Sequence, residues 1–281
     1  MQRNWVMAIA SGILVCGGVL AAGPAAAAGP AGGPLGAAVQ PGGLLQSGTP
    51  VGEAATSPQE GAAAFTTQTV VSSTNWAGYA ATGANGQFTS VSSSWVEPTA
   101  QCGGYGDQYS AFWVGLDGYS SSTVEQTGSE VDCAGRTAEY SAWYEMYPAY
   151  PVYFSNPVKP GDHLTGSVAY QASTSTFLIT LTDSTQKWTQ TANQALPGAV
   201  MNSAEVIAEA PSSGSTGSVL PLTNFGTVNF SGATVNSASL CQSSPVEIVM
   251  PEVNVSSISG CNSFTVSYTG GGGGRSPWPY F

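Results

Sequence analysis

The sequence predicts an all-β domain, built as a sandwich or a barrel. Three observations lead to this prediction. Short runs alternate between apolar residues and small or polar residues, which is the period of a β-strand. Clusters of Gly, Pro, Asn and Ser separate these runs. Thr, Val, Ser and Tyr are abundant, whereas strong helix formers such as Lys, Arg, Glu and Leu are scarce.

The first 28 residues have the organisation of a signal peptide. Arg3 gives a positive start, residues 6–22 are apolar, and residues 26–28 fit a small-residue cleavage site. The alternative is a transmembrane anchor, which would need about 20 apolar residues without the glycines that interrupt this run. We therefore expect secretion, with Cys16 lost together with the signal peptide.

Residues 29–70 predict a low-complexity linker or propeptide. Gly, Ala, Pro, Ser, Thr and Gln dominate, and only Glu53 and Glu60 are charged. Such a segment cannot bury enough apolar area to order itself. Because it contains neither Lys nor Arg, it could not block an acidic cleft by charge.

Residues 71–269 form the predicted β domain. We expect strands at its alternating runs and turns at its Gly, Pro, Asn and Ser clusters. The clearest runs are Leu164–Tyr170, Phe177–Leu181, Val246–Met250 and Phe264–Tyr268, and the clearest turn clusters are residues 84–86, 159–162 and 212–215. The glycine-rich end, residues 270–281, is expected to be a flexible tail.

The charge composition excludes several classes of function. Only 5 residues are Lys or Arg against 16 Asp and Glu, for a formal net charge of −11. Nucleic acid and anionic membranes both require a basic surface, so neither is an expected partner. A single His cannot build a multi-His metal centre. We expect no cofactor and no metal.

Four cysteines remain after the signal peptide. An even number in a secreted chain indicates two disulfides, and the sequence alone allows three pairings. The pairing of Cys102 with Cys133 and of Cys241 with Cys261 closes the shortest loops, so we predict it. A zinc site is the alternative, but the C-x-x-C spacing that such sites use is missing.

Nucleophilic catalysis has little support in the sequence. There is no G-x-S-x-G elbow, and no Asp is followed by the Thr-Gly or Ser-Gly of an aspartic peptidase. His163, the one His, lies in a turn that enters a strand, where we expect a surface residue. The remaining candidates for chemistry are carboxylates and amides.

The densest aromatic stretch surrounds Glu145. On a strand, Trp143, Glu145 and Tyr147 point to the same side, and a carboxyl among aromatic rings is desolvated. The alternative is that Glu145 only bonds tyrosine hydroxyls. In the same way, Trp113 and Asp117 share one side of a second run.

Two further runs carry Gln126 and a pair of glutamates. Gln126 points away from the side that Glu125 faces. On a strand, Glu205 and Glu209 share a side but lie about 13 Å apart, so each needs partners from other strands. These residues predict one polar, aromatic-rich sheet face, without identifying the reaction.

At these residues the sequence resembles the glutamic peptidases, or eqolisins, over residues 74 to 268. Seven motifs in order carry the resemblance. They are Ser73-Thr-Asn75-Trp76-Ala-Gly78-Tyr, Trp95-Val-Glu-Pro98, Trp113-Val-Gly115-Leu-Asp117-Gly118, Gln126-Thr-Gly128, Ala142-Trp143-Tyr144-Glu145-Met-Tyr147-Pro148, Ala204-Glu205-Val-Ile-Ala-Glu209 and Asn224-Phe225-Gly226. Two departures are Met146, where a second Trp is usual, and Ala210, where an acidic residue often follows.

The resemblance implies a fold and an activity. The fold is a sandwich of two curved antiparallel sheets, of the concanavalin-like or jelly-roll type, with a substrate cleft on the concave face. The activity is that of a secreted acid endopeptidase that acts on polypeptides. Because the sequence contains no aspartic dyad, we expect that pepstatin does not inhibit it. We also expect a monomer. Gln126 and Glu209 fall on the catalytic pair, and the positions that line the cleft are Trp113, Asp117, Glu145 and Tyr147.

Two other functions suit the same face. Concave sheets with Trp, Tyr and carboxylates also bind or cleave carbohydrates, and a sandwich on a low-complexity stalk suits an adhesion domain. Incubation with a denatured protein and with polysaccharides, at pH 3–4 and at pH 7, separates the three.

Overall fold

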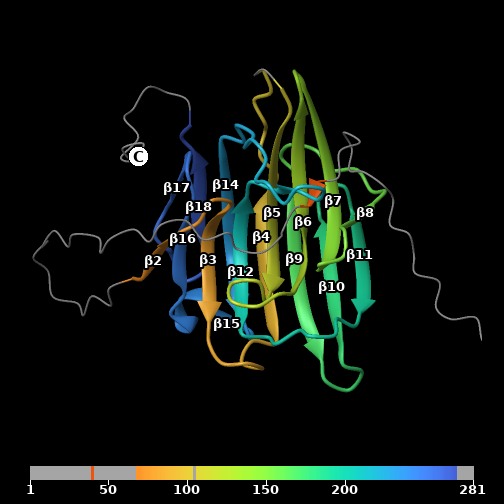
Figure 1. Cartoon of the computed structure of the whole chain (residues 1–281), viewed down its shortest axis with the longest axis vertical. Coiled ribbons are helices and arrows are strands. Elements are labelled where there is room, and N and C mark those ends of the chain that lie inside the picture. The colour runs from red at the N-terminus through yellow and green to blue at the C-terminus, as the bar shows by residue number, and fades with distance from the viewer. Residues whose placement is uncertain (1–38, 41–67, 104–105, 271–281) are drawn as a thin grey trace, which may run out of the picture.

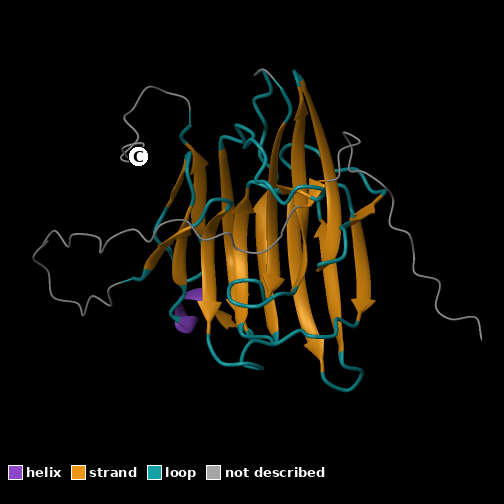
Figure 2. Ribbon diagram, viewed as in Figure 1, coloured by secondary structure: helices purple, strands orange, loops and turns teal. Residues whose placement is uncertain are grey.

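The computed structural model describes residues 39–40, 68–103 and 106–270. Its strands form two eight-stranded sheets that pack face to face, which confirms the expected all-β sandwich (Figure 1). In the described residues, the helical structure is the short 3₁₀ helix η1, Leu240–Ser243, drawn purple in Figure 2. None of the helical segments in these residues has the length and apolar character to cross a bilayer.

The first sheet carries the candidate site residues. It is antiparallel except for the parallel pair at one edge, β2 with β16. In spatial order its strands are β2 (Val70–Ser72), β16 (Val246–Val249), β3 (Trp76–Thr82), β12 (Ser203–Glu209), β5 (Gln108–Leu116), β6 (Val124–Ala134), β7 (Thr137–Tyr147) and β8 (Val152–Phe154).

The second sheet covers one side of the first. In spatial order its strands are β11 (Trp188–Gln194), β10 (Thr176–Asp183), β9 (His163–Gln171), β4 (Ser90–Val96), β14 (Thr227–Val235), β18 (Phe264–Tyr268) and β17 (Val253–Val255), with β15 (Ala238–Ser239) paired to β14. A separate two-stranded ladder joins β1 (Val39–Gln40) to β13 (Ser212–Ser213).

The main hydrophobic core lies between the two sheets. The second sheet contributes every other residue: Phe177, Ile179 and Leu181 of β10 are buried and alternate with partly exposed residues. The first sheet contributes side chains from the side that faces the second sheet, among them Val206 of β12 and Phe112 of β5. Burying such side chains stabilises the fold by about 1.5–3 kcal/mol each.

Several expectations from the sequence are confirmed. The four clear alternating runs fall within β9, β10, β16 and β18, although β16 ends at Val249 rather than at residue 250. The disulfides Cys102–Cys133 and Cys241–Cys261 are both present. The serine cluster at 212–215, expected as a turn, contains the short strand β13 before the turn begins. His163 is exposed at the start of β9.

Other expectations fall outside the described residues. They are the signal peptide at 1–28, the tail from residue 271 onward, and most of the low-complexity segment at 29–70. Residues 39–40 and 68–70 are the described parts of that segment.

Candidate active site

The candidate residues lie on the side of the first sheet that faces away from the second sheet. In β12, Val206 and Ala208 point into the main core, so Glu205, Ile207 and Glu209 point the other way. The apolar residues on this outer side form a second, smaller cluster. Its members are Trp76, Ala80, Ala111, Trp113, Val124, Trp143, Ile207 and Ile248.

Strand register places Gln126 and Glu145 side by side. They are direct partners across β6 and β7, and the Gln126 Nε2 donates a hydrogen bond to Glu145 Oε2 at 2.6 Å. Both side chains are fully buried. On its other side, Gln126 lies opposite Gly115 of β5.

Glu209 lies further along the same outer face. Its partner on β5 is Ala111, which is four residues from Gly115, the partner of Gln126. Four residues correspond to about 13 Å along a strand. The backbones of the expected catalytic pair are therefore separated along the strands, and side chains must bridge the distance.

Trp113 occupies the space between the two. Its indole Nε1 donates to Glu209 Oε2 at 2.8 Å. At the other end of the side chain, a Cβ added to Gly115 would lie 2.9 Å from the Trp113 ring and 3.1 Å from the Gln126 Cβ. Gly128 makes room beneath, since a Cβ there would lie 2.6 Å from the Trp113 Cβ. These contacts explain the glycines in both motifs.

A loop before β3 holds the second oxygen of Glu209. The Asn75 Nδ2 donates to Glu209 Oε1 at 3.4 Å, and the Ser73 hydroxyl donates to Asn75 Oδ1 at 3.0 Å. The backbone N–H of Ala210 donates to the Asn75 carbonyl at 2.8 Å, which fixes the loop against β12. N–H donors therefore face both carboxyl oxygens of Glu209 and fix the orientation of the side chain.

Sequence reasoning singled out neither Ser73 nor Asn75 as a site residue. Both lie in the Ser73-Thr-Asn75-Trp76 motif, but Asn75 and Glu209 are 134 residues apart in sequence. A short polar stretch before an apolar strand looks like an ordinary turn. The motif itself was the signal that could have identified them.

The structure places Asp117 away from the Gln126–Glu145 and Trp113–Glu209 contacts. Its backbone has φ of 68°, just beyond the end of β5, and its carboxylate accepts hydrogen bonds from the backbone N–H groups of Val200, Met201 and Asn202 at 2.8–3.0 Å. These bonds hold the segment that leads into β12. Tyr147, by contrast, packs against the outer cluster of the site face.

The two departures from the glutamic peptidase pattern lie in the main core. Met146 points to the side of β7 opposite Glu145, and Ala210 follows β12; both belong to the core cluster between the sheets. They therefore affect packing behind the site, and neither replaces Gln126 or Glu209.

The site face also carries carboxyls that sequence reasoning did not select. Glu130 and Asp132 follow Gln126 at even spacing on β6, so they share its side, and both are fully buried. Burial raises the pKa of Glu130 to about 7 and that of Asp132 to about 10. Ser141 donates to Glu130 Oε1 at 2.8 Å. Their even spacing from Gln126 along the strand was the sequence feature that could have placed Glu130 and Asp132 on the site face.

Two more carboxyls lie behind or beside the site. Glu97, in the Trp-Val-Glu-Pro motif, accepts a short hydrogen bond from Ser129, which in turn accepts from the Trp95 indole at 2.9 Å. Burial raises the pKa of Glu97 to about 8. Burial, with a smaller contribution from Asp117, raises the pKa of Glu125 to about 9.

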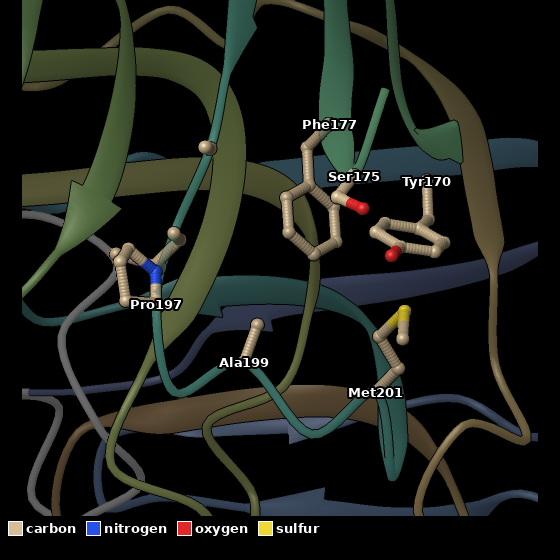
Figure 3. Close-up of a pocket in the computed structure, with 8 residues that line it drawn as sticks. Tyr170, Ser175, Phe177, Pro197, Ala199 and Met201 are labelled. Carbon is tan, nitrogen blue, oxygen red and sulfur yellow. The ribbon is translucent and has the colours of Figure 1, made fainter. Parts of the chain in front are cut away.

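A cavity of about 290 Å³ lies elsewhere in the molecule (Figure 3). It opens beside the β9–β10 turn and the segment that Asp117 holds. Its lining contains no carboxylate and none of the candidate site residues. The lining residues are Tyr170, Ser175, Phe177, Ala195, Leu196, Pro197, Ala199 and Met201.

Comparisons with known proteins match this architecture. The sequence model of the Peptidase A4 family matches residues 74–268. Aspergillopepsin-2 of Aspergillus niger is 32% identical over 185 residues, which cover 59% of this chain and 65% of that protein. The chain thus spans just under two thirds of the length of this relative.

Solved structures agree in fold. Scytalido-glutamic peptidase bound to a transition-state analogue inhibitor is similar at a TM-score of 0.59 and 25% identity, covering 69% of this chain and 98% of that one. SCP-B, an eqolisin peptidase in complex with the tripeptide Ala-Ile-His, is similar at a TM-score of 0.56 and 25% identity, with the same coverage.

Proposed function

The chain belongs to the Peptidase A4 family, and we propose that it is an acid endopeptidase in which Gln126 and Glu209 act on the scissile peptide bond. One observation carries the proposal. A carboxylate held by N–H donors and a glutamine amide held by a carboxyl lie on one sheet face, on either side of Trp113. A peptide lying across Trp113 would meet both groups.

Glu209 is the general base of the proposed reaction. Its carboxylate takes a proton from a water molecule, whose oxygen attacks the carbonyl carbon of the scissile bond. When the C–N bond breaks, the protonated Glu209 returns that proton to the leaving nitrogen. The donors Trp113 and Asn75 orient the carboxyl group for both steps.

Gln126 stabilises the oxyanion that forms on the carbonyl oxygen. Its side-chain NH2 carries two hydrogens, one of which is directed at Glu145. The other would point toward the developing charge. Removing one such donor typically raises the barrier by about 2.7–4 kcal/mol. Glu145 would orient this amide, and Trp113 and Tyr147 would contact the substrate.

Asp117 would act on the site through the backbone. By holding residues 200–202 it sets the start of β12, the strand that ends in Glu209. We propose that it contributes to substrate binding in this indirect way rather than by contact.

The setting suits an acidic, extracellular enzyme. A carboxylate base works best near the ordinary glutamate pKa of about 4.3. Two disulfides are consistent with an extracellular protein. We propose a signal peptide at residues 1–28, a segment at 29–70 that is absent from or loosely attached to the active form, and a monomeric enzyme acting on polypeptides.

The test replaces each of two glutamates of β12 by glutamine, in separate variants. Glu209→Gln keeps the shape of the side chain and removes proton transfer, so peptide hydrolysis at pH 3–4 should nearly disappear. Glu205→Gln is the matched control, because Glu205 lies on the same face of β12 and is equally buried. Initial rates on a denatured protein measure both. Substantial hydrolysis by Glu209→Gln would exclude this mechanism.

A further inference from the structure

One member of the Gln126-Thr-Gly128 motif has no part in the proposed chemistry. Gln126 supplies an amide to the outer face of β6, and Gly128 makes room for Trp113. Thr127 lies between them, and because neighbouring residues of a strand point to opposite sides, its side chain faces the second sheet. Thr127 is fully buried. A polar side chain in this place needs an explanation.

The surroundings of Thr127 are those of the main core. Its direct partners are Val114 on β5 and Tyr144 on β7, and both pack into the core between the sheets. A buried hydroxyl gives up its hydrogen bonds to water, which is costly unless another partner replaces them. Valine would fill nearly the same space without that cost. The reason for threonine is therefore its hydroxyl rather than its shape.

The Thr127 hydroxyl joins β6 to β7. Its Oγ1 donates a hydrogen bond to the Trp143 carbonyl oxygen at 2.7 Å. Trp143 is the register partner of Gly128, one step along the ladder from Thr127 itself. This side-chain bond therefore adds to the backbone pairing of two strands that are neighbours in the sheet (Figure 1).

The Thr127 bond lies directly behind the contact between Gln126 and Glu145. Thr127 follows Gln126 directly, and Trp143 lies two residues before the partner of Gln126. Both bonds therefore connect the same short stretch of β6 and β7. The Gln126–Glu145 bond, at 2.6 Å, is on the outer side of the sheet, and the Thr127 bond is on the inner side. A short bond between two side chains needs backbones at a fixed separation and twist. The hydroxyl constrains both from the opposite side of the sheet.

The other neighbour of Gln126 supplies no side chain. In the row that crosses the sheet at Gln126, the direct partners are Glu145 on β7 and Gly115 on β5. Trp113 requires this glycine, because a Cβ at Gly115 would lie 2.9 Å from its ring. The placement of β7 therefore has a larger effect on the direction of the Gln126 amide than the side chains of β5 have.

We propose that Thr127 is a positioning residue for the reaction: its hydroxyl holds β7 against β6 so that Glu145 aligns the Gln126 amide. The inference rests on the proposed function, because it deepens the task proposed for that amide. Thr127 lies on the side of the sheet opposite the site face, so it has no contact with a substrate there. Its effect should appear in the chemical step rather than in substrate binding.

The first experiment removes the hydroxyl and keeps the branched shape, with Thr127→Val. The kcat for peptide hydrolysis at pH 3–4 should fall about three- to tenfold, with KM within about twofold, because an ordinary hydrogen bond is lost behind the site. Thr127→Ser keeps the hydroxyl and should restore most of kcat. Thr127→Ala should resemble Thr127→Val, which excludes a packing effect of the valine. An unchanged kcat in both variants, or a change in KM alone, would overturn the proposal.

Thr223 offers a matched control. It is a fully buried threonine whose hydroxyl also donates to a carbonyl of β6, that of Val131 at 3.4 Å. Val131 lies further along β6, away from Gln126. Any effect of Thr223→Val should therefore appear in the free energy of unfolding and not in kcat. A similar fall of kcat in Thr223→Val and Thr127→Val would show that Thr127 has only a general structural role.

A double-mutant cycle tests whether Thr127 acts through Gln126. In a chain that carries Gln126→Ala there is no amide to align, so Thr127→Val should lower kcat no further, whereas independent effects would add. A further fall of the same size as in the unsubstituted chain would show that the hydroxyl acts by another route.

Hydrogen exchange of the Gln126 side-chain amide separates this inference from the proposed catalysis. NMR of the full chain at pH 4 can follow this NH2 group, whose signals are identified by their loss in Gln126→Ala. The bond to Glu145 should slow the exchange, and Thr127→Val should make it faster, whereas Thr223→Val should not. This readout needs no turnover, so it stands even if Gln126 is not the oxyanion donor. Equal exchange rates in the two variants would refute the positioning role.

Discussion

The two sheets of the sandwich follow different rules. In the second sheet, β4 and β10 alternate strictly between buried and partly exposed residues. In the first sheet, β12 is buried at every position, and β5 and β6 at nearly every position, including their glutamates and Gln126. Alternating burial, as in the second sheet, is the pattern that a stable sandwich requires. The first sheet departs from this pattern in the strands that carry the proposed catalytic residues.

The departure has a measurable electrostatic signature. Burial raises the pKa of Glu125 to about 9, that of Glu130 to about 7 and that of Glu97 to about 8. All three carboxyls contact the first sheet. A stack of buried carboxyls is tolerable only while they carry protons, because an unpaired buried charge is costly. The first sheet should therefore be most stable at acidic pH, whereas the stability of the second sheet comes mainly from apolar packing.

The largest expected contrast between the sheets is catalytic. Gln126→Ala, in the first sheet, should lower the rate of peptide hydrolysis about 10²–10³-fold by removing the proposed oxyanion donor. Gln190→Ala is the control in the second sheet, where the Gln190 amide bonds Asn156 at 2.7 Å. Steady-state kinetics at pH 3–4 measures both. Similar rates for the two variants would remove Gln126 from the mechanism.

Glu145→Gln should have a smaller effect than Gln126→Ala. The substitution keeps a group beside the Gln126 amide but replaces the carboxylate oxygen that accepts its hydrogen bond. A loss mainly in kcat would indicate that Glu145 orients Gln126, whereas a loss mainly in KM would indicate contact with substrate. A loss as large as that of Glu209→Gln would make Glu145 the candidate base.

The pH dependence of stability should come mostly from the first sheet. These carboxyls hold their protons more tightly in the folded chain than in the unfolded chain, where the glutamate pKa is about 4.3. Their contribution is therefore complete below about pH 4 and declines as pH rises through the folded values near 7, 8 and 9. Between its unfolded and folded pKa values, each such carboxyl lowers the free energy of unfolding by about 1.4 kcal/mol for every unit that the pH rises.

Denaturant unfolding at pH 4, 6 and 7.5 measures this decline. Glu125→Gln should make the profile shallower, since an amide stays neutral at every pH. A flat profile for the unsubstituted chain would show that the buried carboxyls ionise freely in the folded state.

How far the sequence could predict this arrangement depends on the range of each contact. Alternation within one strand placed Glu205 with Glu209 and Trp143 with Glu145, because strand geometry is local. The pairing of Gln126 with Glu145 required the register of β6 and β7. The bond from Asn75 to Glu209 required the neighbouring positions of β3 and β12, which no local pattern contains.

Glycine substitutions should show the same contrast in packing. A Cβ at Gly128 would lie 2.2 Å from the Phe112 carbonyl oxygen, whereas at Gly166, in β9, the nearest atom is a Val114 methyl at 3.0 Å. Gly128→Ala must push backbone apart and should cost about 1–3 kcal/mol, as overpacking does. Gly166→Ala should cost less, since side chains can shift. Unfolding free energies at pH 4 compare the two, and a reversed order would contradict this account.

The smallest expected contrast concerns two serine hydroxyls. The Ser129 hydroxyl, buried in the first sheet, accepts from the Trp95 indole and donates to Glu97. Ser129→Ala leaves both partners unsatisfied in the core, which should cost about 1–3 kcal/mol. Ser94, in the second sheet, bonds the Thr165 hydroxyl at an exposed position, so Ser94→Ala should change stability by less than about 0.5 kcal/mol.

Ser129→Ala should also show which partner matters more. Loss of the bond to Glu97 removes a donor that favours its carboxylate, so the pKa of Glu97 should rise further above about 8. The cost of Ser129→Ala should therefore be greater at pH 9 than at pH 4, while that of Ser94→Ala stays constant. A cost for Ser129→Ala that does not change with pH would assign its role to the Trp95 indole instead of the carboxyl.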